Sequence, residues 1–447
     1  MRALPIRRRP LPGVRTLSSA LTGSDTGRAA GLGAAATAQN VLALAFTIVF
    51  ARLLGASGYG SLAVLISAYI ILMVPGSALQ IAVAREISGD VATNSVHAGA
   101  GVRRWLARLV LVTLVVALAA IPLRSAIGAL INVDDLWGAA AVPVTAMLWV
   151  ILCVERGALQ GFRRYRPVAL SMVGDACARI LFALLLFAIG LDVTGAFLGA
   201  ALAFFAMSLA LLVPLNSELP ASKLDDHHEA RLRDLLARTR APVIALTLLL
   251  ALQELHVIIV KHEASGDAAG SYAVAAVAAK AIVWIAVGLG MYLVPEAARR
   301  ARRGEDARPV LLRTLGLIAA AGIPMVLVYA IAGRPLLETV FGEDLALASD
   351  ALPWLGLAMV LLACSYLSVQ YLLALGHWRF TVLLAVAVVV EVVALIAIGA
   401  DLTAVALALF GLQGVCAATL LFLALRPARQ VEALGRPETA RALLLPE

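Results

Sequence analysis

Six ionisable side chains lie within long apolar stretches of this sequence, and they are the residues best able to do chemistry. They are Asp175, Arg179, Glu254, His256, Lys280 and Glu391. An ionisable group in apolar surroundings usually faces a partner, a water-filled cavity or a ligand. Cations in such a place can hold an anionic group such as a phosphate, and carboxylates can exchange a proton or an ion. The set therefore predicts a polar site inside an apolar protein.

Lys280 is the strongest candidate for binding an anion. No ionisable residue lies within one turn of it along the chain, so it must meet a carboxylate from another segment, reach the surface, or bind an anionic ligand. Glu254 and Glu391 are its plausible partners, and Glu254 either pairs permanently with Lys280 or exchanges protons. Asp175 and Arg179 are four residues apart, which places them on one helical face. Either they form a self-contained ion pair, or Arg179 faces a cavity and Asp175 modulates its charge.

Two further arginines and two amides complete the candidate set. Arg85 either meets an incoming phosphate or anchors its helix to lipid headgroups, as basic residues at span ends commonly do. Arg52 lies near the opposite end of the same apolar segments, where few basic residues occur. Asn40 and Gln80 are candidates for uncharged polar groups lining a cavity. His256 is interpreted as a hydrogen-bonded packing residue.

Composition identifies the solvent around these residues. Of 447 residues, 62% are hydrophobic and 14% are charged, with a mean hydropathy of +0.95. Soluble domains are about 45–50% apolar and about 25% charged. The net charge of +8 does not indicate nucleic-acid binding, because the basic residues cluster in short segments between apolar runs. The four cysteines lie inside apolar runs without a CxxC pair, so we expect neither a disulfide nor a zinc site.

The apolar runs predict an all-α polytopic membrane protein with twelve transmembrane helices. Segments that cross lipid must satisfy their backbone hydrogen bonds internally, which requires helices here. Thirty of the 36 basic residues fall on one side of this topology and four on the other. The positive-inside rule then predicts a cell membrane protein with both termini on the cytoplasmic side. The predicted spans are 30–53, 61–84, 107–124, 138–160, 167–190, 193–215, 241–261, 271–294, 311–332, 351–375, 379–399 and 402–424.

The longest polar insert, 216–240, divides the chain into two sets of six spans. The predicted domains are a basic tail (1–28), an amino-terminal bundle (29–216), a linker (217–240), a carboxy-terminal bundle (241–425) and a second tail (426–447). The basic first tail resembles the flank of an uncleaved start-transfer helix more than a signal peptide. The insert is either a short amphipathic helix on the inner membrane surface or a solvated linker. Its run "DDHHE" lacks the spacing of a formed metal site.

The two halves contain a weak internal repeat. With an offset of 210 residues, "FARLLGASGYGSLAVL" aligns with "VKHEASGDAAGSYAVA", so that Gly60-Ser61 meets Gly270-Ser271. Both stretches join the first and second spans of a half. Since six spans return the chain to the same side, the halves are parallel repeats related by an axis along the membrane normal. Repeats of this kind form transporters with a central site between the halves.

The segments "FARLLGASGYGSLAVLISAYIILMVPGSALQIAVAREIS" and "VIIVKHEASGDAAGSYAVAAVAAKAIVWIAVGLGMYLVPEAAR" resemble the polysaccharide flippases of the multidrug/oligosaccharidyl-lipid/polysaccharide exporter superfamily. The resemblance covers residues 29–90 and 245–300 and includes Gly270-Ser271-Tyr272 and Pro295. It implies two six-helix bundles forming a V around a central cavity, with alternating access. It also implies export of a lipid-linked oligosaccharide whose phosphate meets Lys280, Arg179, Arg85 or Arg52. Glu254, Asp175 and Glu391 are then candidates for coupling or counter-ion roles.

Other functions remain open from the sequence. An ion-coupled multidrug exporter of the same superfamily keeps the fold and changes the ligand, although acidic cavities suit cationic drugs better. A membrane enzyme such as a polysaccharide polymerase is disfavoured, because the longest predicted outer loop (333–350) contains no recognisable catalytic constellation. A twelve-span facilitator-type transporter agrees with the span count alone. We expect a monomer with no cofactor and no metal, whose partners are a lipid-linked sugar, membrane lipids and polysaccharide assembly proteins.

Overall fold

A computed structural model describes residues 25–92, 101–219 and 227–426. Throughout these ranges the chain forms helices joined by short turns, and they contain no strand. The elements are α2 (Asp25–Leu72), α3 (Val74–Ala92), α4 (Val102–Ile131), α5 (Leu136–Gly161), α6 (Tyr165–Ala188), α7 (Asp192–Glu218), α8 (His227–Glu263), α9 (Gly266–Arg302), α10 (Arg308–Val340), the 3₁₀ helix η1 (Glu343–Leu345), α11 (Leu352–Ala374), α12 (Thr381–Ile398) and α13 (Leu402–Leu425).

The first apolar hairpin consists of α2 and α3. Helix α2 has 48 residues and is interrupted at Gly55, which has φ 66° and ψ −175°. Side-chain-bearing residues rarely adopt this positive φ, so glycine permits the reversal. Eleven described stretches are long and apolar enough to cross a membrane, and the first, Gly31–Val91, holds 61 residues. A helix of that length would span about 90 Å, three times the hydrocarbon thickness, so this stretch accounts for two crossings.

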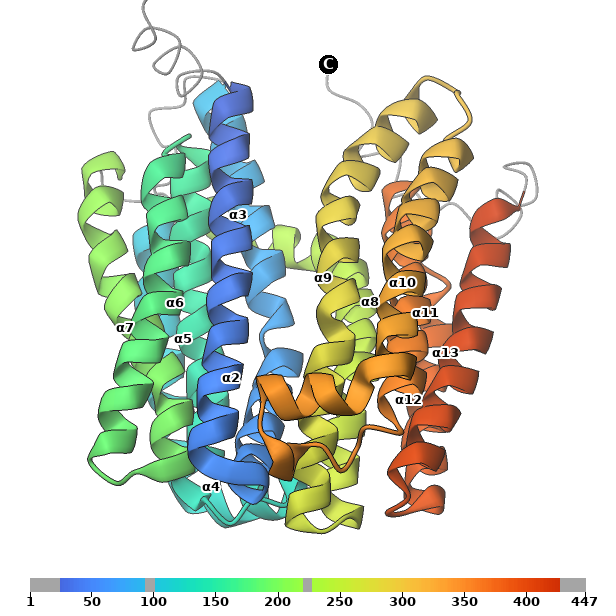
Figure 1. Ribbon diagram of the computed structural model, residues 1–447. Helices are drawn as coiled ribbons and strands as arrows, with labels where there is room; N and C mark the ends of the chain where they lie inside the picture. Colours follow the sequence, from blue (N-terminus) through green and yellow to red (C-terminus); the bar gives the residue numbers. More distant parts are fainter. Residues whose placement is uncertain (1–24, 93–100, 220–226, 427–447) are drawn as a thin grey trace, which may run out of the picture.

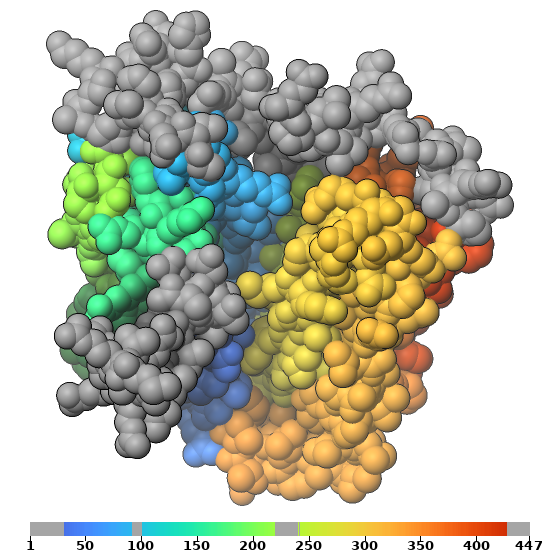
Figure 2. Space-filling view, turned by 90° about the horizontal axis from the view of Figure 1, so that it is seen from above, coloured from blue at the N-terminus to red at the C-terminus, as the bar shows by residue number. Residues whose placement is uncertain are grey.

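The helices group into two bundles, as predicted. Helices α2–α7 form the amino-terminal bundle and α8–α13 the carboxy-terminal bundle, and they stand side by side in Figure 1. The bundles touch mainly through α2 and α3, which pack against α8 and α9. Figure 2 shows the two bundles next to each other when seen along their long axis. Twelve crossings in two six-helix bundles confirm the predicted fold.

We call the end where α2 begins and α13 ends the inner end, which the charge distribution predicts to face the cytoplasm. At the opposite, outer end, α10 bends at Ala332, whose φ is −129°. The last turns of α10 then run across the outer end of the molecule (Figure 1). The predicted span 311–332 stopped at this bend, because hydropathy does not reveal that the helix continues after it.

The polar insert between the bundles differs in part from both interpretations of it. Residues 220–226 lie outside the described ranges, and so do the two predicted terminal tails apart from their bundle-proximal residues. From His227 onward the chain is helical and continues without interruption into the first crossing of the second bundle. The second half of the insert is therefore an extension of α8 and not a separate surface helix.

Candidate functional site

A cavity of about 360 Å³ lies between the two bundles. Its walls come from α2, α5, α6 and α7 on one side and from α8 and α9 on the other. Aromatic rings form much of the lining, namely Phe46, Tyr59, Tyr69, Trp149, Phe197 and Trp284. The polar lining consists of Gln39, Asn40, Thr47, Ser67, Arg179, Gln253, Glu254 and Lys280. An apolar pocket with a few converging polar groups is the usual form of a small-molecule site.

Lys280 meets a carboxylate from the neighbouring helix. Its Nζ lies 2.7 Å from Oε2 of Glu254, which also accepts a hydrogen bond of 2.7 Å from the Ser67 hydroxyl. Gln253 donates to the other oxygen of Glu254 at 2.9 Å. Ser67 belongs to α2, so this carboxylate joins the two bundles across the cavity. Of the alternatives open in the sequence, Lys280 therefore adopts the pairing with Glu254 and not with Glu391.

Asp175 has a different principal partner from the one that its spacing favours. Arg156 of α5 lies 2.5 Å from the Asp175 carboxylate, whereas Arg179 lies 3.9 Å away. The side chains of Arg156 and Asp175 are both buried, and Gln39 of α2 donates to Asp175 as well. The self-contained i,i+4 pair is thus wrong as the main interaction. Packing between α5 and α6 brings the guanidinium of Arg156 closer to the carboxylate than that of Arg179.

Arg179 is the least neutralised charge facing the cavity. Its guanidinium lies 5.4 Å from the Phe204 ring centroid, which allows a cation–π contact, and its Nε has no hydrogen-bond partner among the described residues. Of the charged residues that line the cavity, Arg179 and Lys280 are cationic and Glu254 is anionic. The polar wall therefore carries one formal positive charge in excess.

The remaining predicted site residues lie elsewhere. Asn40 lines the cavity. Gln80 contacts Gln160 at 3.3 Å between α3 and α5, away from the cavity lining, and Arg85 is an exposed residue near the inner end. Glu391 is fully buried within the carboxy-terminal bundle, outside the cavity. Arg52 is at the outer end and is also outside the cavity.

A group of buried polar residues lies inside the carboxy-terminal bundle. His256 shares a hydrogen bond of 2.9 Å with the Tyr272 hydroxyl, in agreement with its interpretation as a packing residue. Both carboxylate oxygens of Glu391, and both amide atoms of Gln413, have no partner among the described residues. Each such atom costs about 1–3 kcal/mol if it stays unsatisfied. The position is consequently open to a proton, an ion or water.

The outer end is closed by a tight crossing of α2 and α9. A Cβ on Gly60 would lie 3.0 Å from the backbone nitrogen of Gly270, and a Cβ on Gly270 would overlap the carbonyl group of Ala56. Gly60 and Gly270 are the two positions that the sequence repeat equates. Equivalent residues touch only near a two-fold axis, so the approximate axis between the halves passes close to this contact. Small residues permit such close helix approach.

Polar contacts reinforce this crossing, which we call the outer seal (Ala56, Gly60, Gly270 and the contacts named here). Arg52 donates to the backbone carbonyls of Thr339 and Val340, at 2.5 and 3.0 Å, at the end of α10. The last carbonyls of a helix lack intrahelical donors and carry partial negative charge. Asn132 donates to the carbonyl of Lys261 at 2.7 Å. All three hydrogen bonds connect one bundle to the other.

Several site residues were not predicted. Gln39, Ser67 and Gln253 are uncharged, and nothing in their local sequence distinguishes them from other polar residues in spans. Arg156 was counted with the inner basic residues, although it lies within the predicted span 138–160. That position inside a span was the available signal for a buried arginine.

Comparisons with known proteins identify the fold. No protein-family model matches this sequence, and no curated protein is significantly similar to it. Among solved structures, the chain is similar to an inward-facing multidrug resistance MATE family transporter of the MOP superfamily. The TM-score is 0.74 at 12% identity, over 89% of this chain and 95% of the other.

Two further structures are similar over more of the chain. One is an outward-facing multidrug resistance MATE family transporter, with a TM-score of 0.60 at 14% identity over 93% of this chain and 98% of the other. The second is a MOP superfamily transporter from Pyrococcus furiosus, for which reverse polarity of the binding pocket suggests a different function. Its TM-score is 0.65 at 13% identity, with 93% and 98% of the two chains covered. The chain thus has the fold of these transporters.

Proposed function

We propose that this protein is an alternating-access membrane transporter and that the structure represents an inward-facing state. The observation that carries the proposal is the outer seal, which closes one end of the interface between two bundles that enclose a polar cavity. The greater similarity to an inward-facing than to an outward-facing MATE transporter supports the same state. Transport would then require the seal to open while the inner ends of the bundles come together.

Gly270 offers a direct test of the seal. We expect Gly270→Ala to abolish or strongly reduce transport in proteoliposomes, because its methyl group overlaps the Ala56 carbonyl and opposes the closed outer end. Gly288→Ala is the matched control, since a Cβ at Gly288 of the same helix meets no atom within 4 Å. Labelling of cavity residues from the outer side should increase only in Gly270→Ala. Normal transport by this variant would contradict the proposed role of the seal.

For the substrate we infer an amphipathic molecule that carries a negative charge. Aromatic walls favour an apolar body, and the excess positive charge at Arg179 favours an anionic group. A volume of about 360 Å³ lies near the lower end of the range for drug-sized ligands. Together with the fold of multidrug transporters, these features favour an exporter of drug-sized organic anions over the lipid-linked sugar flippase that the sequence resemblance implied.

The flippase remains a second candidate because of one specific observation. Arg179 has an unpartnered Nε beside the cavity, and a guanidinium suits the phosphate or diphosphate of a lipid-linked sugar. In that function the cavity would hold the headgroup while the lipid tail stayed in the membrane. Glu391 is the candidate for coupling in either function, since a proton or a monovalent cation would satisfy its two oxygens.

One assay distinguishes the substrates. Purified protein in liposomes is given a fluorescent organic anion, a cationic dye and a short-chain lipid-linked sugar in separate experiments. We expect movement of the organic anion and its loss in Arg179→Gln, with Arg85→Gln, an arginine outside the cavity, as the control. Movement of the lipid-linked sugar alone would favour the flippase. Movement of the cationic dye alone would contradict an anionic substrate while leaving the transport cycle intact.

A further inference from the structure

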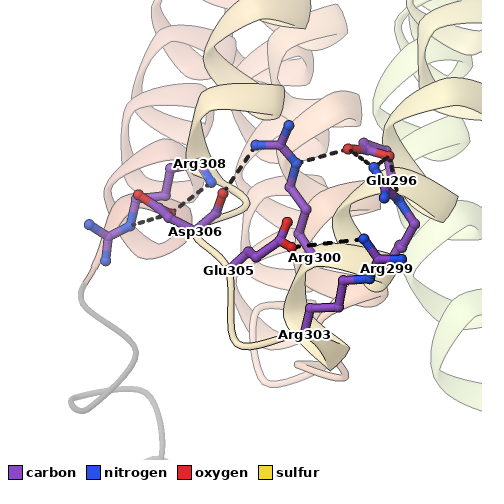
Figure 3. Close-up of polar contacts among 7 residues, drawn as sticks. All are labelled: Glu296, Arg299, Arg300, Arg303, Glu305, Asp306 and Arg308. Atoms are coloured by element: carbon purple, nitrogen blue, oxygen red, sulfur yellow. Dashed lines mark hydrogen bonds and ion pairs between the residues drawn. The ribbon is translucent and has the colours of Figure 1, made fainter.

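The inner ends of the two bundles handle their arginines differently. At the turn between α9 and α10, acidic residues neutralise most of the basic ones, and Figure 3 shows this network of Glu296, Arg299, Arg300, Arg303, Glu305, Asp306 and Arg308. Arg299 alone makes two hydrogen bonds of 2.7 Å to Glu296. Four of the five arginines of this turn (Arg299, Arg300, Arg303 and Arg308) thus lie within ion-pair distance of a carboxylate, and Arg302 has no such partner among the described residues.

The turn between α5 and α6 holds three arginines within four residues, namely Arg163, Arg164 and Arg166. Only Arg164 is paired, with Glu218 at the end of α7, at 2.5 Å. No hydrogen bond or ion pair is formed by the side chains of Arg163 and Arg166 among the described residues. Both side chains are exposed. The turn therefore keeps an excess of two positive charges.

These arginines surround a pocket of about 420 Å³. It lies between the α5–α6 turn and the last turns of α7, and its lining residues are Arg163, Arg164, Tyr165, Arg166, Pro167, Pro214 and Ser217. None of them lines the central cavity, so this is a second and separate site. The Arg164–Glu218 pair ties the two sides of the pocket together.

The backbone at Arg163 adds to the case for a binding role. Arg163 has a φ of 59°, in the left-handed region, directly after the end of α5. Helices commonly end with glycine at this position, because a Cβ is unfavourable there by about 1 kcal/mol. Arg163 therefore places a cation at the pocket despite this conformational cost.

The chemistry of the pocket matches a phosphodiester with a hydroxylated headgroup. Two unpaired guanidinium groups are suited to bind the oxygens of one phosphate. The Ser217 hydroxyl donates its proton to the Pro214 carbonyl at 2.8 Å, so it can only accept a further hydrogen bond. A hydroxyl group on the ligand would be the donor that this oxygen lacks. A glycerol headgroup supplies such a hydroxyl next to a phosphate.

The surface below the pocket is suited to a lipid rather than to a free phosphate. Leu170 lies one turn after Arg166 on α6, and Val213 and Leu209 lie one and two turns before Ser217 on α7. These side chains are 63%, 76% and 51% exposed, and they extend from the pocket toward the middle of the predicted membrane. Acyl chains can cover this apolar surface while the headgroup stays at the basic rim.

We propose that the α5–α6 turn and the end of α7 form a specific site for an acidic phospholipid of the inner leaflet, with phosphatidylglycerol as its best-matched ligand. The phosphate binds Arg163 and Arg166, and the glycerol hydroxyl donates to Ser217. The site adds a lipid ligand to the lipid-facing surface of the amino-terminal bundle, at its inner end. It does not depend on which substrate the central cavity carries.

Native mass spectrometry of the full-length protein in detergent tests the site, with phosphatidylglycerol and phosphatidylcholine as probes. We expect wild-type protein to retain phosphatidylglycerol preferentially. Arg163→Gly/Arg166→Gln should weaken this binding at least about tenfold, since it removes two charge-assisted interactions. Glycine suits the left-handed position, so this variant preserves the turn. Arg302→Gln/Arg303→Gln is the matched control, because it removes two exposed arginines at the inner end of the other bundle, of which Arg303 is paired with Glu305.

The outcomes separate a specific site from general electrostatics. Equal loss of phosphatidylglycerol in both double variants, or equal retention of the two lipids by wild-type protein, would overturn the proposal. Displacement of the lipid by inorganic phosphate, but not by chloride at the same ionic strength, would identify a site for free phosphate instead. If the pocket variant does not fold, the single variants Arg166→Gln and Ser217→Ala replace it. Arg166→Gln should weaken all acidic lipids, and Ser217→Ala should remove the preference for phosphatidylglycerol over phosphatidic acid.

Discussion

Each bundle buries a carboxylate, and these two carboxylates, Asp175 and Glu391, have opposite surroundings. In the amino-terminal bundle, the Asp175 carboxylate accepts hydrogen bonds from Arg156 and Gln39 and lies within 3.9 Å of Arg179. In the carboxy-terminal bundle, Glu391 is equally buried, but neither of its oxygens meets a donor among the described residues. Asp175 thus has a nearly closed set of donors, whereas Glu391 has none among the described residues.

This difference separates structural from functional uses of intramembrane charge. A buried carboxylate with several matched donors contributes to a single arrangement of helices and is costly to disturb. A buried carboxylate without donors contributes little to packing and is available for a ligand or a proton. The comparison therefore predicts that conservative changes at the two sites affect different properties.

The largest effect is expected from Asp175→Asn. The change leaves Arg156 buried without its counter-charge, and breaking a buried pair in this way costs about 3–5 kcal/mol. Thermal unfolding followed by size-exclusion chromatography should show a strongly lowered midpoint. A midpoint equal to that of wild-type protein would show that the network does not stabilise the amino-terminal bundle.

An intermediate effect is expected at the pair that faces the central cavity. Lys280→Met should destabilise the protein, because it leaves the Glu254 carboxylate buried without its cation. Adding Glu254→Gln should restore part of the loss, because it removes that unpaired negative charge. We expect a coupling energy of about 1–3 kcal/mol between the two changes. A double-mutant cycle on unfolding midpoints measures it, and strict additivity would mean that the 2.7 Å contact contributes no net interaction.

The smallest effect on stability is expected from Glu391→Gln, which keeps the shape of a side chain that has no donors to lose. We expect a change of less than about 1 kcal/mol in the free energy of unfolding. Transport, in contrast, should lose its dependence on an ion or pH gradient in proteoliposomes. If Glu391→Gln destabilised the protein as much as Asp175→Asn, the distinction between a closed network and an open site would be wrong.

The elements that the sequence predicted well are those set by local composition. The reversal between the spans 30–53 and 61–84, the twelve crossings and the division near 216–240 all follow from runs of apolar residues interrupted by glycine and charge. The repeat that equates Gly60 with Gly270 was weak as a sequence signal. Its meaning emerged only when the two residues were found in contact.

The partners in the buried ion pairs could not be identified from local sequence. The spacing of Asp175 and Arg179 predicted a pair on one helix, yet Arg156 from another helix is the closer partner. For Lys280, Glu254 and Glu391 were equally acceptable in the sequence, and Glu254 is the observed partner. The choice depends on how each helix is rotated about its axis, and hydropathy contains little information on this rotation.

By itself, the sequence determined that this chain crosses a membrane in two similar halves, because the cost of exposing backbone and charge to lipid acts on each segment locally. The tertiary structure alone decided which charges are neutralised, where the outer end closes and which arginines remain free. Those outcomes depend on distances of a few ångströms between helices that lie far apart in the chain.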